Sequence, residues 1–309
     1  MSEQNNFNLV SLYSISPLHT GGVTQEGNLL GIARESHTNL PYVPSSTIRG
    51  RLRATENNRV KKVRLFGPRL EDLKDTDFVA EYEQQPDRRK VKIKDQEEIA
   101  EFNQLEQGDI WIGDASILWL PVPSLSHGVI WISCPMLIER WVRFNPHSNI
   151  TLSDLKGLEY KTNVGVNNPI YLKDAIIKDN LQKWEEKDWH KFVPKQSEVN
   201  SIKRVLVLPD QYCTTVIQMS LWRQVKIKLD QHKIVDRGFR YEEAIPPDTL
   251  MYFPWGTTFQ ANGTAETSRQ NFQNLINANP VLQIGGQEGL GRGFVQMWID
   301  SPDNWKSRL

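Results

Sequence analysis

The sequence predicts an α+β fold, because β-rich segments and amphipathic helices alternate along the chain. Residues 9–15 (LVSLYSI) predict a first strand that ends before Pro17, and a helix follows at Ser45. Two Ile-, Trp- and Val-rich runs within residues 108–133 predict a hairpin, and a second helix follows at Pro135. The predicted order is therefore strand, helix, strand, strand, helix.

The elements before the hairpin follow from local signals. Residues 17–44 are polar and glycine-rich, which predicts a long functional loop. Ser45 and Ser46 can each cap the first helix through a hydroxyl. Residues 62–94 are charged without a clear period and predict a loop with short elements. The following DQEEIAEFNQLEQ predicts a short amphipathic helix capped by Asp95.

The second half of the chain predicts an insertion and then further strands. Residues 145–200 are polar and irregular, which is typical of an insertion. Residues 216–229 have β character and end in an alternation of apolar residues with lysines, so one face is apolar and the other basic. A turn at 230–232 and a returning strand are expected. A helix over 268–278 precedes two strands that flank a Gly-rich loop, residues 285–293.

Composition excludes several classes of protein. The 309 residues include 37 Lys or Arg and 37 Asp or Glu, so a basic partner surface can arise only from local clustering. No uncharged apolar run approaches the about 18 residues of a membrane span, and the N-terminus lacks a signal-peptide pattern. Two distant cysteines provide no disulfide framework. These observations predict a cytoplasmic protein without a membrane partner.

Several catalytic motifs are absent from the sequence. There is no C-x-x-C, H-E-x-x-H, Walker A or G-x-S-x-G pattern, and the six histidines show no metal-ligand spacing. His19, in the loop after the first strand, is a candidate general base, and a structural hydrogen-bonding role is the alternative. The tryptophans in strand and helix patterns are predicted to lie in the core rather than to stack on bases. They are Trp111, Trp119, Trp131 and Trp141.

The Gly-rich loop does not fit a dinucleotide-binding fingerprint. Its spacing is G-G-x-x-G-x-G-x-G, and a strand rather than a helix is predicted after it. A wide hairpin turn is one interpretation. The other is that the glycines allow close approach to a phosphodiester chain, with Arg292 adding positive charge.

The helix that begins near Ser45 is strongly basic. Residues 49–64 contain seven Lys or Arg residues against one Glu, a local net charge of +6. The helix N-terminus with its two hydroxyls suits an anion, and phosphate is the expected ligand. A solvated basic helix face is the alternative. The basic residues are Arg49, Arg51, Arg53, Arg59, Lys61, Lys62 and Arg64.

Three segments resemble one known family. PLHTGG followed by GIARESHTNLPYVPSSTIRGRLR resembles a signature of CRISPR-associated RAMP proteins, although the usual P-G-S-S is P-S-S here. GDASILWLPVPSLSHGVIWISCPMLIERW is similar to a stretch of the backbone subunit, the fourth subunit, of type III-B (Cmr) effectors. FRYEEAIPPDTLMYF and IGGQEGLGRGFVQM are similar to its C-terminal segments. The resemblance extends over residues 9–299 in the same order.

The resemblance implies a modified ferredoxin-like (RRM-like) RAMP fold with an inserted thumb and peripheral elements. It implies one domain over 1–309, with insertions over approximately 62–107 and 145–215. The implied partners are a CRISPR guide RNA (crRNA), complementary target RNA, copies of the same chain and other type III effector subunits. Base pairing reads the target sequence in such effectors, while protein reads backbone and shape. The implied RNA-binding residues are His19, Gly21, Gly22, Ser45, Ser46, Arg49, Arg53, Gly285, Gly286, Gly289, Gly291 and Arg292.

One departure from the family pattern concerns cleavage. Active members carry an Asp shortly before the I-x-R-E-x-H-T segment, and the alignment places Leu29 there. A leucine binds no hard cation and accepts no proton. The expectation is therefore a guide-binding backbone subunit that does not cut target RNA and needs no cofactor. The first alternative is a metal-dependent endoribonuclease that uses Glu26 with Mg²⁺ or a similar ion. The second is a guide-processing endoribonuclease that uses His19.

Overall fold

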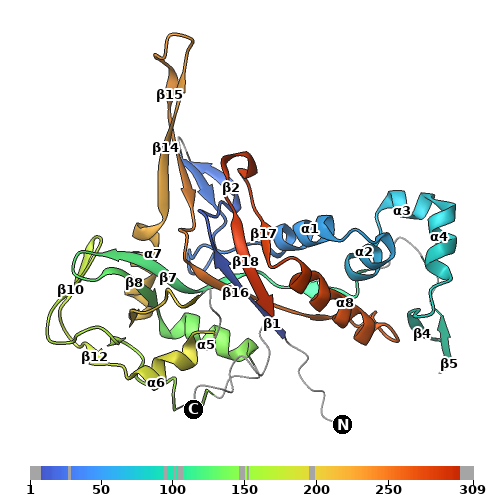
Figure 1. Ribbon diagram of the computed structural model, residues 1–309, viewed down its shortest axis with the longest axis horizontal. Coiled ribbons are helices and arrows are strands. Elements are labelled where there is room, and N and C mark those ends of the chain that lie inside the picture. Colours follow the sequence, from blue (N-terminus) through green and yellow to red (C-terminus); the bar gives the residue numbers. More distant parts are fainter. Residues whose placement is uncertain are drawn as a thin grey trace.

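The structure is a computed structural model that describes residues 8–26, 29–93, 96–99, 102, 107–145, 150–151, 153–194 and 199–299. Its helices and strands confirm the predicted α+β class (Figure 1). Within the described ranges the helices are α1 (Ser45–Thr55), α2 (Arg59–Phe66), α3 (Leu70–Lys74), α4 (Thr76–Glu83), α5 (Pro135–Phe144), α6 (Glu186–Trp189), α7 (Asp210–Ser220) and α8 (Ala265–Ala278), with 3-10 turns η1 (His190–Phe192) and η3 (Glu288–Leu290).

The described strands form one large sheet and two smaller ones. The large sheet has the order β12 (Gln182–Lys183), β9 (Lys161–Thr162), β13 (Val205–Val207), β8 (Gly128–Ser133), β7 (Ser116–Ser124), β16 (Leu250–Thr257), β1 (Asn8–Ser14), β18 (Phe294–Ile299), β17 (Val281–Gln283). It is joined by β6 (Ile110–Ile112), β10 (Ile170–Leu172) and β11 (Ala175–Ile177). The second sheet has the order β14 (Trp222–Leu229), β15 (Val235–Ala244), β3 (Leu29–Ile32), β2 (Gly21–Glu26), and the third pairs β4 (Lys90–Ile93) with β5 (Gln96–Ile99).

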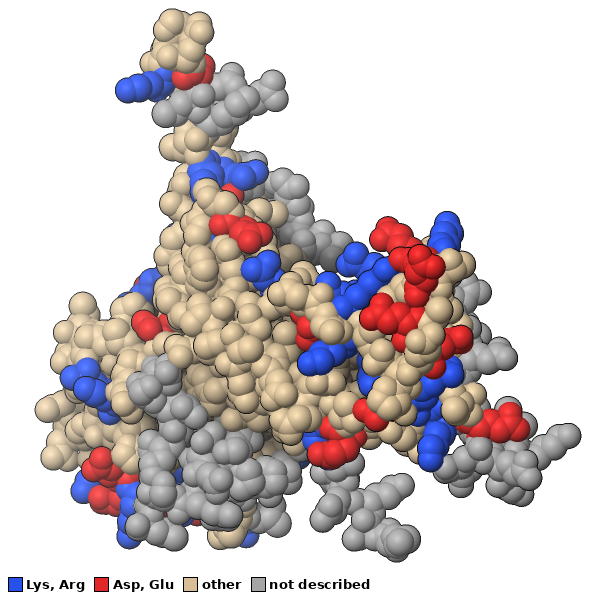
Figure 2. All heavy atoms as spheres, turned by 45° about the vertical axis from the view of Figure 1, so that its right-hand side comes forward, with Lys and Arg blue, Asp and Glu red and all other residues tan. Residues whose placement is uncertain are grey.

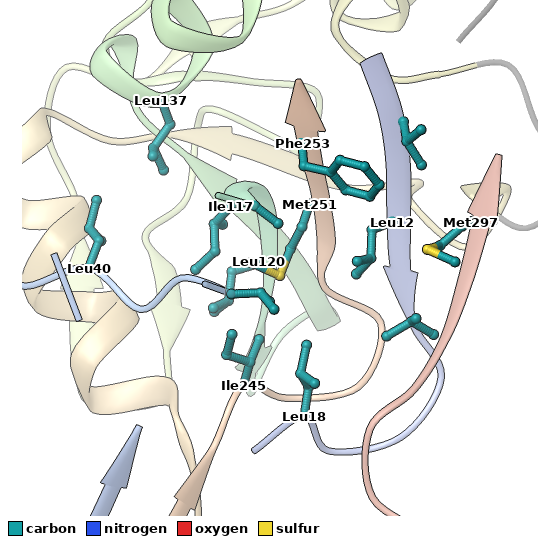
Figure 3. Close-up of a cluster of buried hydrophobic side chains, with 14 of the residues drawn as sticks. Leu12, Leu18, Leu40, Ile117, Leu120, Leu137, Ile245, Met251, Phe253 and Met297 are labelled. Atoms are coloured by element: carbon teal, nitrogen blue, oxygen red, sulfur yellow. The ribbon is translucent and has the colours of Figure 1, made fainter. Parts of the chain in front are cut away.

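The core lies on both sides of the central strands β1, β7 and β16. Most residues of these strands are buried, as expected for strands that are covered on both faces. Leu12 of β1 and Phe253 of β16 are fully buried, and Figure 3 shows them beside Met251 and Met297. Of the tryptophans predicted to be in the core, Trp119, Trp131 and Trp141 are buried, whereas Trp111 is half-buried. None of the helices described is both apolar enough and long enough to span a bilayer.

A long hairpin, β14 and β15, projects away from the body (Figure 1), and we call it the thumb, residues 222–244. The predicted alternation and return strand are confirmed here, because Val225 pairs with Tyr241 and Ile227 with Phe239. All four of these side chains are between 41% and 54% exposed. The alternation of apolar and polar residues in the thumb therefore does not arise from burial against the core. It leaves the apolar face of the thumb exposed to solvent.

Other strand and helix predictions are confirmed. The hairpin within residues 108–133 is β7 paired with β8, and α5 begins at Pro135 as expected. The helix predicted over 268–278 is α8, which begins three residues earlier. β17 and β18 flank the Gly-rich loop. The division into one domain with insertions over 62–107 and 145–215 stays a prediction.

The short elements expected within residues 62–94 are present as most of α2 together with α3, α4 and β4. Their type escapes a periodicity search because short charged helices bury only a few residues each. Three local predictions are wrong. Residues 17–44 contain β2 and β3 instead of loop alone. Residues 96–99 form β5 instead of a helix; much of the rest of that predicted helix lies outside the described residues. Residues 216–220 belong to α7, whose buried Cys213, Val216, Ile217 and Ser220 have helical spacing.

Candidate functional site

A hollow lies at the foot of the thumb, where the β2–β3 hairpin, the loop after β3 and the start of α1 meet α7. Its volume is about 770 Å³, within the range of ligand-binding sites. Only Gly21 and Ser46 of its lining carry a binding role predicted from the sequence. The charged and amide side chains that line it come from segments far apart in the chain and meet only in the fold. They are Arg34, Glu35, Asn39, Gln218, Arg223 and Glu243.

Leu29, at the position where the family pattern has an Asp, lines this hollow. It begins β3, where it pairs with Tyr241 of the thumb on one side and with Glu26 of β2 on the other. The side chain of Glu26 lies outside the described residues. The hydrocarbon side chain of Leu29 provides neither a metal ligand nor a base at this wall.

The described carboxylates of the hollow are both held by arginines. Glu35 receives two hydrogen bonds from Arg140, one of 3.2 Å from Nη2 to Oε2, and a third from the Thr38 hydroxyl. Glu243 is 1% exposed and accepts from Arg34 Nη2 at 2.6 Å and from Arg223 Nε at 2.9 Å. Arg34 Nη1 also donates to the Gln218 amide.

The described residues therefore do not fit a site for Mg²⁺ or a similar ion. Hard divalent cations need several oxygen ligands, and carboxylates paired with arginine are already neutralised. In the part of the chain that the structure describes, no group of three or more His, Cys, Asp or Glu side chains converges in a metal-binding arrangement.

His19 links the loop after β1 to the Gly-rich loop. Its Nδ1 lies 2.8 Å from the carbonyl oxygen of Glu243, so Nδ1 carries the proton and donates. The backbone N–H of Gly286 donates to the carbonyl of His19 at 2.8 Å. Because His19 is only 5% exposed, its hydrogen bonds are structural in this arrangement.

The Gly-rich loop divides into inward and outward glycines. Gly285 has φ +82°, and a Cβ there would lie 2.4 Å from the His19 carbonyl oxygen. At Gly293 a Cβ would lie 1.9 Å from the Ile284 carbonyl oxygen. Gly289 and Gly291 face open space, and the first of them has no positive φ. The outward pair therefore leaves backbone accessible to a ligand.

Helix α1 turns two of its arginines into the protein. Arg49 donates to the carbonyls of Ile110 at 3.1 Å and Phe66 at 2.8 Å. Arg53 donates to the carbonyls of Phe66 at 3.1 Å and Gly67 at 2.5 Å. Burial lowers the pKa of both guanidinium groups. Their predicted RNA contacts stay untested, but these donors are engaged within the protein.

The opposite face of α1 points toward the Gly-rich loop. Arg51 Nη1 lies 4.0 Å from Glu288 Oε1, and the Arg51 side chain is 38% exposed. Ser46 is exposed at the start of the helix. Neither serine caps α1: the N-cap residue is Pro44, and the backbone N–H of Ser45 donates to Asp114 Oδ1 at 2.6 Å.

Much of the remaining basic stretch is also paired. Arg59 donates to Asp72 at 3.0 Å and to Asp75 at 2.6 Å, and the second of these hydrogen bonds lowers the pKa of Asp75. Arg64 donates to the carbonyl of Asp87 at 2.5 Å. Figure 2 shows Lys and Arg mixed with Asp and Glu over α2–α4. The +6 charge counted over residues 49–64 is thus neutralised in part by carboxylates outside that range.

Arg292 is buried rather than presented to a ligand. It is 4% exposed, forms an ion pair with Glu242 Oε2 at 3.2 Å and donates to Gln224 Oε1 at 2.8 Å. Its guanidinium lies 4.6 Å from the centre of the Trp222 ring. Sequence reasoning missed Arg34 and Arg223 as binding candidates. For Arg34 the available signal was its place in the R-E-x-H-T motif. For Arg223 it was its place on a strand of alternating apolar and polar residues.

Comparisons with known proteins agree with this architecture. A protein-family model for the RAMP superfamily matches residues 11–296. The CRISPR system Cmr endoribonuclease Cmr4 of Pyrococcus furiosus is 25% identical over 325 residues, which cover 96% of each chain. A crystal structure of Cmr4 is 22% identical with a TM-score of 0.63, and covers 95% of this chain and 98% of its own.

A further structural match comes from the type III-B Cmr-beta complex bound to cognate target RNA. One of its chains is 18% identical with a TM-score of 0.67, and covers 95% of this chain and 96% of its own. These matches confirm the modified ferredoxin-like RAMP fold that the resemblance implied. The chain belongs to the RAMP superfamily.

Proposed function

We propose that this chain is a crRNA-binding backbone subunit of a type III CRISPR effector. It polymerises along the guide RNA, organises the guide–target duplex and contacts other effector subunits. The family match, the relative named Cmr endoribonuclease Cmr4 and the similar fold in a target-bound Cmr-beta complex support this proposal. A contact between copies agrees with the similar fold of an oligomeric Cmr4, at a TM-score of 0.63.

One observation carries the RNA-binding part of the proposal. The outward face of α1, the outward glycines of the Gly-rich loop and the hollow under the thumb adjoin one another. Arg51 of α1 lies beside Glu288 of the loop. His19 contacts both Gly286 of the loop and the carbonyl of Glu243, which lines the hollow. A phosphodiester backbone needs cations and accessible N–H groups, and this surface offers both. Ser46, Arg51, Gly289 and Arg223 are the residues that we assign to contacts with the guide backbone.

Gly289 tests this placement, because the fold leaves open space around it. Gly289→Val is expected to leave the free energy of unfolding nearly unchanged and to weaken RNA affinity, since the side chain occupies the space of the RNA backbone. Affinity for a labelled single-stranded RNA and denaturant unfolding are measured on the same sample. Unchanged affinity would make this loop a plain hairpin turn.

We further propose that the assembled effector binds target RNA without cutting it, because Leu29 replaces the expected Asp. The relative from Pyrococcus furiosus is named an endoribonuclease, so the two proteins would differ at this wall of the hollow. The alternative, cleavage with Glu26, has one supporting observation: Glu26 pairs with Leu29 across the β2–β3 hairpin. Guide processing through His19 has no such support, because His19 is buried.

The decisive experiment uses the complex purified with its operon partners. Bound RNA is extracted and sequenced, and uniform RNA that begins in a CRISPR repeat is the expected result. Complementary RNA is then incubated with the complex and Mg²⁺, and should stay intact. Cutting that disappears in Glu26→Ala would establish the alternative. Random cellular RNA in the complex would contradict the guide-binding role.

A further inference from the structure

Two consecutive glutamates, Glu242 and Glu243, lie near the base of β15 and are almost fully buried, at 0% and 1% exposure. They pair with Gln224 and Arg223 of β14, and we call these two residue pairs the thumb root. Neighbouring residues of a strand point to opposite faces of the sheet. Each face of the thumb root therefore has one buried carboxylate of its own.

The first face centres on Glu243. Arg223 lies directly across the strand pair and donates its Nε to this carboxylate at 2.9 Å, and Arg34 donates from the loop after β3 at 2.6 Å. The Arg223 side chain is 54% exposed. Since Nε is engaged and no described residue accepts a hydrogen bond from its terminal nitrogens, those nitrogens face solvent in a fixed direction.

The second face centres on Glu242. Arg240 Nη2 lies 2.9 Å from Oε1, while Lys226 Nζ at 3.9 Å and Arg292 Nη1 at 3.2 Å approach Oε2. Arg240 is 60% exposed and Lys226 30%, whereas the buried Arg292 is held by Gln224 and Trp222. Arg292 thus completes the internal pairing, and the other two cations project outward.

The charges on the two faces do not balance. Among the described side chains, five cations surround two carboxylates, which leaves an excess of three positive charges around the thumb root. A single carboxylate engages at most two of the five N–H donors of an arginine in a bidentate pair. Basic and acidic side chains lie close together where the thumb leaves the body (Figure 2). A partner with negative charge would complete this arrangement.

We propose that the thumb root carries two phosphate sites for RNA, one on each face. Arg223, supported by Arg34, forms the first site, and Arg240 with Lys226 forms the second. Glu243 and Glu242 act as positioning residues that hold these cations in place before RNA arrives, which lowers the ordering cost of binding. This inference rests on the proposed RNA-binding function and extends it to both faces of the thumb.

Salt dependence tests each site separately. The logarithm of the affinity for a labelled single-stranded RNA is measured against the logarithm of the salt concentration. Each lost phosphate contact lowers the magnitude of the slope by about 0.7. Arg223→Gln and Arg240→Gln should each produce this change, and the double variant about twice as much. Arg143→Gln, which removes a 75% exposed arginine from α5, is the matched control and should leave the slope unchanged.

Glu243→Gln separates positioning from general electrostatics, because the two predict opposite signs. The substitution removes one negative charge and so raises the net charge of the chain by one, which would tighten RNA binding if the attraction were diffuse. If Glu243 positions Arg223 and Arg34, binding weakens although the chain becomes more positive. Tighter binding would overturn the positioning role. Should this variant fail to fold, the slopes of the two arginine variants still decide whether the sites exist.

The outcomes keep this inference apart from the proposed function. A wild-type protein that binds no RNA would contradict the proposed function itself. Wild-type binding with a normal slope in both arginine variants would overturn only the two phosphate sites. A lowered slope in one variant alone would remove the site on the other face.

Discussion

The basic stretch at residues 49–64 and the thumb root use positive charge in opposite ways. Residues 49–64 have the higher charge density in the sequence. Arg49 and Arg53 nevertheless donate hydrogen bonds to backbone carbonyls, and Arg59 donates to aspartates. The thumb root combines cations from several segments around two buried carboxylates and leaves Arg223 and Arg240 largely exposed.

The difference lies in where the hydrogen-bond donors point. A buried carbonyl cannot be left without a donor except at a considerable cost, so an arginine that satisfies it is held in the protein. A buried carboxylate that meets a surface arginine at one nitrogen fixes the side chain but leaves its other donors outside. A cluster of basic residues in the sequence therefore does not by itself predict a binding surface. The hydrogen-bond partners of each basic side chain in the fold decide which of them can bind a ligand.

The largest expected effect concerns Arg292, the buried cation of the thumb root. Arg292→Ala removes one partner of the buried Glu242 and is expected to lower the free energy of unfolding by about 3 kcal/mol, as when a buried ion pair loses one member. Denaturant unfolding measures the loss. A change no larger than that of Arg143→Gln would mean that Arg240 and Lys226 suffice for Glu242, and Arg292 would no longer be the structural cation of that face.

Two arginines on opposite faces of α1 sharpen the comparison further. Arg49→Gln is expected to lower the free energy of unfolding by about 2 kcal/mol, because the carbonyls of Ile110 and Phe66 lose charged donors, and to leave the salt slope of RNA binding unchanged. Arg51→Gln should do the reverse, with little loss of stability and a slope lower in magnitude by about 0.7. Equal slopes in both variants would erase the distinction between inward and outward arginines.

Much of the fold could be predicted because its signals are local. β-rich segments predicted β1 and β7, Pro135 marked the start of α5, and alternation predicted β14. The failures share a cause. α7 contains β-branched Thr and Val residues whose β preference is overridden by packing of Cys213 and Ile217 at helical spacing. β2 and β3 are strands because they pair with the thumb sheet, which no local pattern reveals.

The site was predicted less completely, because most of its contacts are long-range. Gly289 and Ser46 were accessible from sequence as a glycine in a loop and a residue at a helix start. The pairing of Arg34 with Glu243 joins residues 209 positions apart, so neither could be assigned a partner beforehand. Arg292 was predicted as an RNA-binding residue from its charge and from the resemblance, and its burial against Trp222 of β14 depends on a contact between segments 70 positions apart.

A surface ion pair outside both regions gives the smallest expected effect and sets the scale for the others. Hydrogen bonds from Thr151, followed by those from Lys191, lower the pKa of Asp154 to about 2. The folded-state pKa lies below the unfolded value of about 3.9, so Asp154 stabilises the fold above that pH, and this contribution is lost as the pH falls toward 2. Because solvent screens the group, Asp154→Asn should cost at most about 1 kcal/mol at neutral pH.

The pH dependence of that cost identifies its origin. The difference in unfolding free energy between wild type and Asp154→Asn should shrink between about pH 4 and pH 2, as the wild-type carboxylate gains a proton. Urea unfolding at several pH values measures it. A cost independent of pH would place the loss in packing rather than in charge. The Asp154–Lys191 pair would then not measure the stability contributed by an exposed charge. The stability contributed by the buried ion pairs of the thumb root could not be compared with it.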